Sequence, residues 1–154
     1  MKEIIGTKIT NIFFNEDYLR FKTDKGDFTY EVDGDCCSTS VFYDFFGVKK
    51  LLENGAVTEV EEIAIHPKDI VTTKESEWYT SQKDNKRSDE DIKVYGFAIT
   101  TISEEFGEMT SVVSFRNYSN GYYGGYLSLS TFTGEVLPEI FDDVLDSAKT
   151  GKND

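Results

Sequence analysis

Alternating apolar and polar residues in the first third of the chain predict three consecutive β-strands. The runs 8–14 and 18–23 alternate with a period of two residues, and the run from Phe28 to Val32 does the same. Asp24-Lys25-Gly26 separates the second run from the third and has the composition of a tight turn. We therefore expect an antiparallel meander in which each strand turns one face to the core.

A helical spacing replaces this alternation between residues 41 and 52. Apolar side chains there recur every three or four positions, which is typical of the buried face of an amphipathic helix. Ser38 or Ser40 would cap the start of this helix, and Asn54-Gly55 would end it. The apolar face would consist of Val41, Phe42, Phe45, Val48, Leu51 and Leu52.

The second half of the chain predicts a second meander. A strand is expected over 57–65, where the pattern suits a bulge, and further strands over 93–102, 110–115 and 126–131. Asn120-Gly121 lies in the last reversal and is a strong short-range signal for a β-hairpin.

Residues from about Pro138 to Lys149 predict a C-terminal helix. Proline suits the first turn, acidic residues follow it at the positive end of the helix dipole, and Lys149 lies near the negative end. Its apolar face would use Ile140, Phe141, Val144, Leu145 and Ala148. The expected fold class is therefore α+β: an antiparallel sheet built from two meanders, with one helix between them and one C-terminal helix.

The chain has the length of one domain, so residues 1–154 are expected to form a single domain. Within it, the charged and polar segment 67–91 is expected to be a long loop or insertion. Residues 150–154 would be a flexible tail.

The net charge of −13 argues against binding to nucleic acid, because proteins that bind phosphate backbones present a basic surface. No stretch approaches the roughly 20 apolar residues that span a bilayer, and the first residues lack the apolar run of a signal peptide. We therefore expect a cytoplasmic protein with neither a nucleic acid nor a membrane as its partner.

One segment departs from this acidic composition. From Met109 to Gly134 the only charged side chain is Arg116, and tyrosines and glycines surround it. An arginine fork beside aromatic faces suits a small anionic ligand that carries a base or a ribose. Alternatively, the glycines only permit tight turns and the tyrosines pack on the sheet. The candidate ligand-binding residues are Arg116, Asn117, Tyr118, Asn120, Tyr122, Tyr123 and Tyr126.

The adjacent cysteines Cys36 and Cys37 are the second candidate. They could form a vicinal disulfide, bind a soft metal, or supply a nucleophile to pair with His66. A structural zinc ion usually needs four ligands, and the chain has two cysteines and one histidine. We therefore expect no metal and no cofactor, and we interpret the cysteines as small buried residues at a strand-to-helix corner capped by Asp35 or Ser38.

Two short motifs carry a resemblance to a known family. Gly34-Asp35-Cys36-Cys37-Ser38 and Ser119-Asn120-Gly121-Tyr122-Tyr123 resemble segments that recur at comparable spacing in short bacterial and phage proteins of largely unassigned function. The likeness covers roughly Ile5 to Leu129. In its general layout the chain also looks like phage counter-defence sponges, which sequester cyclic-nucleotide or cyclic ADP-ribose immune signals. That second resemblance implies a nucleotide-derived ligand.

The chain contains no phosphate-binding loop, dinucleotide fingerprint, nucleophile elbow or zinc-protease motif, so we do not expect an enzyme. The expected function is non-catalytic binding and sequestration of a small nucleotide-derived signal, by a homodimer. The alternative is an acidic protein-interaction module that inhibits a host defence factor. An enzyme that hydrolyses such a signal is a third hypothesis.

Overall fold

The computed structural model describes residues 1–35, 38–64, 91–119 and 124–145. The predicted polar loop 67–91 lies outside these residues except for Asp91, which begins a strand. The predicted tail 150–154 and both cysteines also lie outside them.

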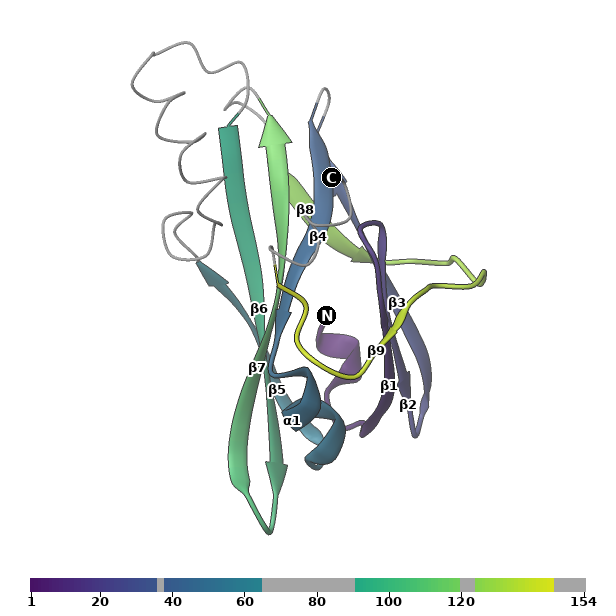
Figure 1. The fold of residues 1–154 in the computed structure, drawn as a ribbon, viewed down its shortest axis with the longest axis vertical. Helices are drawn as coiled ribbons and strands as arrows, with labels where there is room; N and C mark the ends of the chain where they lie inside the picture. The colour runs from purple at the N-terminus through teal and green to yellow at the C-terminus, as the bar shows by residue number, and fades with distance from the viewer. Residues whose placement is uncertain (36–37, 65–90, 120–123, 146–154) are drawn as a thin grey trace.

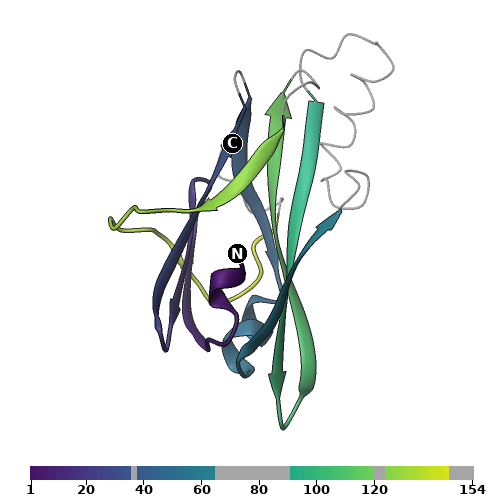
Figure 2. The ribbon, with the colours of Figure 1, turned by 180° about the vertical axis from the view of Figure 1, so that it is seen from behind.

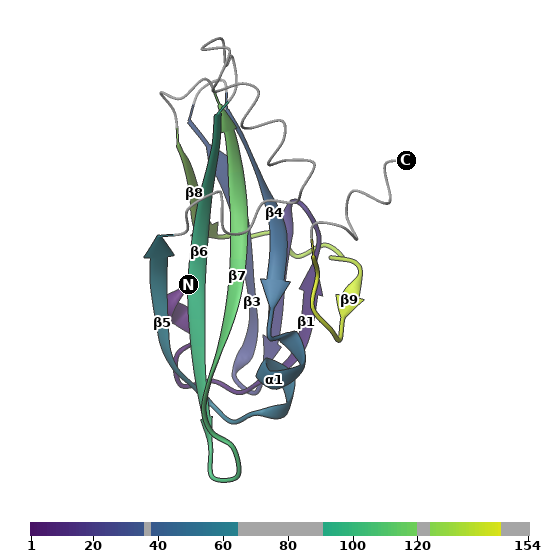
Figure 3. The same cartoon turned by 60° about the vertical axis from the view of Figure 1, so that its left-hand side comes forward.

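Two antiparallel sheets face each other across a shared apolar interior (Figures 1 and 3). The five-stranded sheet has the order β8-β3-β2-β1-β9, formed by Gly125–Leu129, Gly26–Gly34, Tyr18–Thr23, Ile9–Phe14 and Glu139–Ile140. The four-stranded sheet has the order β4-β7-β6-β5, formed by Thr39–Phe46, Gly107–Ser119, Asp91–Ser103 and Val57–Ala64. The short helix α1, Val48–Glu53, and the 3₁₀ turn η1, Lys2–Ile4, complete the described elements.

The expected α+β class is wrong, because the described residues form mostly antiparallel β-structure with α1 as their one α-helix. The first meander is confirmed: β1, β2 and β3 pair in sequence, and Leu19 and Phe21 are fully buried. The strand expected over 57–65 is confirmed as β5, with an irregularity between Val57 and Glu59.

A β-bulge explains why the segment 41–52 resembles a helix. β4 pairs Phe42 with Phe115 and Asp44 with Ser114, so Tyr43 is an extra residue in the strand. The extra residue places Phe42 and Phe45 on the same buried face, three positions apart. A strand thereby acquires helical spacing, and the predicted helix shrinks to α1, which ends just before the predicted stop at Asn54.

The helix predicted from Pro138 is also wrong over the residues described. Glu139 and Ile140 form β9 and pair with Phe13 and Ile12 of β1, and Val144 forms a bridge with Phe45. Phe141 and Leu145, which the helix would have buried, are 64% and 42% exposed. Pairing with two exposed strand edges outweighs the local helix signals here. Ala148 and Lys149 lie outside the described residues.

The second meander is confirmed only in part. β6 and β7 form a long hairpin that extends beyond the rest of the molecule (Figure 1). β8, however, pairs with β3 of the other sheet rather than with β7, so the predicted hairpin between β7 and β8 is wrong (Figure 2). The chain crosses from one sheet to the other between Ser119 and Gly124.

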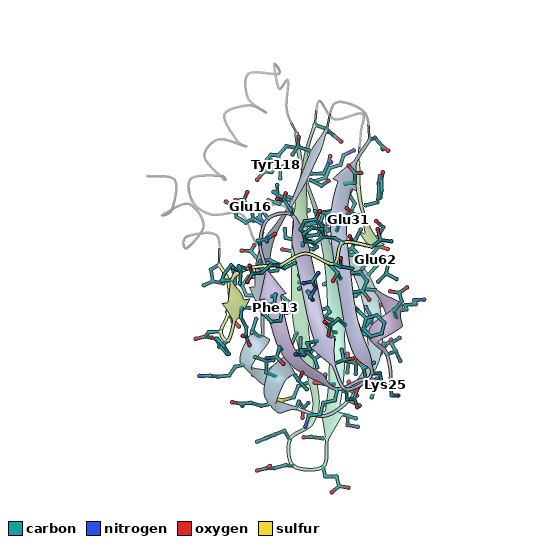
Figure 4. All side chains as sticks on the ribbon, turned by 90° about the vertical axis from the view of Figure 1, so that its right-hand side faces the viewer. Phe13, Glu16, Lys25, Glu31, Glu62 and Tyr118 are labelled. Carbon is teal, nitrogen blue, oxygen red and sulfur yellow. The ribbon has the colours of Figure 1, made fainter. Side chains whose placement is uncertain are left out.

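The segment between β8 and β9 crosses the outer face of the five-stranded sheet (Figure 4). Arg20 holds it there, donating to the carbonyl oxygens of Gly134 at 2.7 Å and Phe132 at 3.0 Å. The ring of Phe132 stacks on Tyr18 with 4.4 Å between the ring centroids. The segment thus connects β8 at one edge of the five-stranded sheet with β9 at the opposite edge. Among the described residues no helix is long and apolar enough to cross a membrane.

Candidate functional site

Strand β7 presents two buried polar residues on opposite faces. Val113 and Phe115 lie in the core between the sheets, so by strand alternation Asn117 faces the space between the sheets and Arg116 faces the other way. Both side chains are fully buried. The two residues that we expected to contact one ligand therefore lie in separate environments.

Arg116 forms a buried ion pair within the four-stranded sheet. Its Nη1 lies 3.1 Å from Oδ2 of Asp44, and the two side chains are 0% and 2% exposed. The guanidinium carbon lies 3.8 Å from the centroid of the Tyr43 ring, which suits a cation–π contact. Tyr43 and Asp44 are consecutive residues at the β4 bulge, and both contact the guanidinium of Arg116. The guanidinium of Arg116 is therefore buried against protein groups and is not exposed to solvent.

Asn117 forms part of a polar network at the other face. Its Nδ2 donates to the hydroxyl oxygens of Ser38 at 3.2 Å and Ser40 at 3.0 Å. Those hydroxyls donate in turn to the carbonyl oxygens of Asp35 and Asp33, each at 2.7 Å. Each serine thus accepts from the amide and donates to the backbone, which fixes the orientation of the amide.

The first sequence motif meets Gly124, the residue that follows the second motif, beside this network. The backbone N–H of Asp35 donates to the carbonyl of Gly124 at 3.0 Å, and the N–H of Gly124 donates to the Asp35 carboxylate at 3.3 Å. Segments 89 positions apart are therefore joined. We call this region the polar seam, and it consists of Asp35, Ser38, Ser40, Tyr95, Asn117, Gly124 and Gly125.

Two glycines allow the strands of the seam to approach closely. A Cβ atom on Gly34 would collide with the Ser38 hydroxyl and lie 2.9 Å from Nδ2 of Asn117. A Cβ on Gly125 would collide with the Ser40 hydroxyl and lie 3.1 Å from Cβ of Asn117. Close packing of β3 and β8 against β7 therefore requires glycine at both positions.

Aromatic rings line the core side of the seam. Tyr95 and Phe97 of β6 are half-buried and stack on Phe115, with centroid distances of 4.8 and 6.3 Å. The Tyr95 hydroxyl accepts from the backbone N–H of Gly125 at 3.2 Å. Lys93 lies two residues before Tyr95 and directly opposite Asn117 in the strand register. The seam therefore combines an amide, hydroxyls, aromatic faces and one nearby ammonium group.

Oδ1 of Asn117 is a buried acceptor with no hydrogen-bond partner among the described residues. Leaving a buried acceptor unsatisfied costs about 1–3 kcal/mol, so such an atom needs an explanation. A water molecule or a donor group of a ligand would satisfy it.

The structure separates the predicted binding residues. Asn117 lies in the seam, Tyr118 lies on the same face of β7 as Arg116, and Tyr126 is 50% exposed on the five-stranded sheet. Asn120, Tyr122 and Tyr123 lie outside the described residues. Sequence reasoning did not find Ser40, Tyr95 or Lys93 as neighbours of Asn117, because only the pairing of strands distant in sequence brings them together.

A further buried hydroxyl lies near the N-terminus, where Tyr30 donates to Oε1 of Glu3 at 2.9 Å. Burial, together with the bond to Glu3 and its charge, raises the pKa of Tyr30 well above its ordinary value. Burial opposes ionisation of Glu3, but hydrogen bonds from its own backbone and from Tyr30, with the nearby terminal ammonium, outweigh it and lower the pKa of Glu3.

In the part of the chain that the structure describes, no three His, Cys, Asp or Glu side chains gather as a metal site would require. Cys36, Cys37 and His66 are not among those residues, so the alternatives for the cysteines are unchanged.

The fold and the seam together define a two-sheet antiparallel β protein whose sheets are joined at one end by a buried polar network. The chain belongs to the family described as domain of unknown function DUF7448, whose family model matches residues 2–129. The expected membership of an uncharacterised family is thus confirmed. The match includes the whole seam and ends with β8. No curated protein and no solved structure matches the chain.

Proposed function

We propose that this protein binds and sequesters a small nucleotide-derived molecule without converting it, and that the polar seam holds the nucleoside part of that molecule. The protein would act in the cytoplasm, as a counter-defence protein that removes an immune signal. The observation that carries the proposal is the buried Asn117 amide, whose Nδ2 is held by two serines while Oδ1 has no partner among the described residues.

The chemistry of the seam suits a nucleoside better than a phosphate. An amide oxygen accepts from the exocyclic amino group of a base, and the ring of Tyr95 offers a face on which a base stacks. The Asp35 carboxylate would accept from ribose hydroxyls but would repel a phosphate. The backbone N–H groups of Gly124 and Gly125 already donate to Asp35 and Tyr95, so they are not available for an anion.

Ligand-dependent stabilisation tests this proposal. The purified protein is heated with cyclic mononucleotides, cyclic dinucleotides and ADP-ribose derivatives, each in turn. A ligand at 100 times its dissociation constant stabilises a protein by about 2.7 kcal/mol, which gives a measurable rise in Tm. Asn117→Ala should weaken binding at least about tenfold, since that factor corresponds to about 1.4 kcal/mol, the size of one hydrogen bond. If no compound of the panel raises Tm, the proposal fails.

Two further variants make the test specific to the seam. Tyr95→Leu removes the aromatic face on which the base would stack and keeps an apolar side chain, so it should weaken binding while the protein stays folded. Tyr126→Ala changes an exposed tyrosine outside the seam and should leave binding unchanged. Equal losses in both variants would place the ligand elsewhere. The bound compound is then recovered after denaturation: intact compound supports sequestration, and a converted product would support an enzyme.

The long hairpin supports the acidic interaction module as a second candidate. At its tip Ile102 and Phe106 are 49% and 56% exposed, and Glu104, Glu105 and Glu108 surround them. Such a tip suits a partner with an apolar pocket and a basic rim. If this tip carries the function, Phe106→Ser should abolish inhibition of the partner and Asn117→Ala should leave it intact.

A further inference from the structure

The two sheets formed by the described strands have four edges, and three of these carry features that block pairing with another strand. β9 has only two residues, and Phe45 of β4 exchanges two backbone hydrogen bonds with Val144, each of 3.0 Å. β5 exposes Glu59, Glu61 and Glu62. Short length, covering segments and charged side chains are the usual ways in which proteins protect sheet edges.

Among the described residues, the fourth edge, β8, is protected only at its start, where the N–H of Gly125 is bonded to the Tyr95 hydroxyl. Its five residues carry no charge, and Tyr126 and Leu129 are each about half exposed, at 50% and 51%. Among the described strands, β8 is the last of its sheet and pairs only with β3 (Figure 2).

The backbone groups that β8 turns away from β3 follow from its hydrogen bonds. Ser130 donates to Thr29 of β3 at 2.7 Å, and Gly124 accepts from Asp35 at 3.0 Å, so the even-numbered residues face β3. By alternation Gly125, Leu127 and Leu129 direct their backbone groups outward. The bond from the Gly125 N–H to Tyr95 agrees with this direction.

Charge favours a second copy of the chain as the occupant of this edge. Two molecules of net charge −13 repel each other over most of their surfaces. Between Met109 and Gly134 the one charged side chain is Arg116, which is buried against Asp44. β8 lies within this neutral stretch, and the nearest carboxylates in the sheet register, those of Glu31 and Asp33, belong to β3, one strand further from the edge. Two copies can therefore approach along β8 with less repulsion than along the acidic edge of β5. A basic partner would meet no carboxylate on β8 itself.

We propose that β8 pairs antiparallel with β8 of a second copy, about a twofold axis at Leu127, so that two five-stranded sheets become one continuous sheet. Leu127 would exchange two backbone hydrogen bonds with the partner's Leu127. The N–H of Leu129 would donate to the carbonyl of the partner's Gly125. By symmetry, the carbonyl of Gly125 would accept from the N–H of the partner's Leu129. This register gives the longest overlap that a five-residue strand allows.

Sedimentation of matched variants at position 127 tests the interface. Proline is tolerated in an edge strand where its missing N–H faces outward, so Leu127→Pro should fold and keep its pairing with β3. It should sediment as a monomer over a concentration range in which the wild-type protein and Leu127→Ile sediment as dimers. A wild-type protein that stays monomeric throughout, or a folded Leu127→Pro that remains dimeric, would overturn the proposal.

Hydrogen exchange of the wild-type protein decides the matter even if Leu127→Pro fails to fold. Concentrating the protein should slow exchange of the Leu127 and Leu129 amides, while exchange of the β5 amides stays constant. Exchange in β8 that does not depend on concentration would overturn the proposal. So would β8 protection that arises only when a strand of a different protein is present, because that would identify another occupant. None of these results depends on nucleotide binding, so this proposal and the proposed function fail independently.

Discussion

Arg116 and Asn117 are neighbours in sequence and are both fully buried, yet they lie in opposite kinds of polar environment. Arg116 pairs with a carboxylate and an aromatic ring that β4, the adjacent strand, supplies through its bulge. Asn117 reaches the segment between β3 and β4 and leaves one acceptor without a partner among the described residues. The charge of Arg116 is matched by a carboxylate inside the protein, whereas Asn117 retains an acceptor oxygen for another donor.

This difference shows what a buried polar group can do. A buried charge that faces an opposite charge contributes to a specific structure, and its removal takes the counter-charge away from the partner. An amide with one unused atom still has a hydrogen bond to offer to a ligand or a water molecule. The ion pair gives Arg116 a structural role, and the unused acceptor is the reason why Asn117 is the residue proposed to bind a ligand.

Loss of the buried charge should have the largest effect on stability. Arg116→Met removes the cation that Asp44 faces in a buried site, and breaking such a pair typically costs about 3–5 kcal/mol. Urea unfolding measures this loss. The double variant Arg116→Met/Asp44→Leu should recover most of it, since apolar replacement of both partners is often neutral. A loss in Arg116→Met below about 1 kcal/mol would be typical of an exposed pair and would remove the contrast with Asn117.

Crowding the seam should have the next largest effect. The backbone of Gly125 is not in the left-handed region, so Gly125→Ala adds only a methyl group, which would collide with Ser40 and press on Asn117. Overpacking of this kind costs about 2 kcal/mol. The control is Ser128→Ala in the same strand, where an exposed side chain is removed and the change should stay within about 0.5 kcal/mol. Equal stability of the two variants would show that the seam is loosely packed.

The contrast between these sites also indicates what the sequence could reveal. Period-two patterns predicted β1, β2, β3 and the β6–β7 hairpin, because these strands pair with their neighbours in sequence. The same patterns could not show that β8 pairs with β3, since register between distant segments depends on packing of the whole fold.

The candidate site was only partly predictable for the same reason. Composition singled out the segment around Asn117, and the two motifs were visible in the sequence. Whether a residue of β7 faces the seam or the ion pair depends on which face of its sheet packs against the other sheet, and a neutral stretch does not reveal that. The bulge at Tyr43 hid the strand that supplies Asp44, because the extra residue gave its apolar positions a helical spacing.

Tyr30 is a third buried polar residue, and its hydrogen-bond partner, Glu3, is partly exposed to solvent. Tyr30→Phe removes the hydrogen bond to Glu3. The free energy of unfolding should fall by about 1.5 kcal/mol, the contribution of a hydrogen bond to a charged acceptor near solvent. The raised pKa of Tyr30 means that the folded state holds this proton more tightly than the unfolded state, so its contribution is complete below pH 10.0 and declines above it. Unfolding from pH 8 to 11 should therefore show a steeper loss in the wild-type protein than in Tyr30→Phe. Parallel pH profiles would contradict this assignment.

The smallest effect is expected at a polar contact on the surface. Oδ1 of Asp143 accepts from the backbone N–H groups of Gly47 at 2.9 Å and Val48 at 3.1 Å, and so caps the start of α1 from outside the helix. Asp143→Ala should cost about 1 kcal/mol, the usual value for a helix cap, whereas Asp143→Asn keeps an acceptor oxygen and should lose only a few tenths. Thermal unfolding of both variants measures the difference. The effect should be small because water replaces a lost acceptor at an exposed site. A loss of stability here as large as that of Arg116→Met would mean that burial does not decide the size of these effects. The contrast between Arg116 and Asn117 would then need another physical basis.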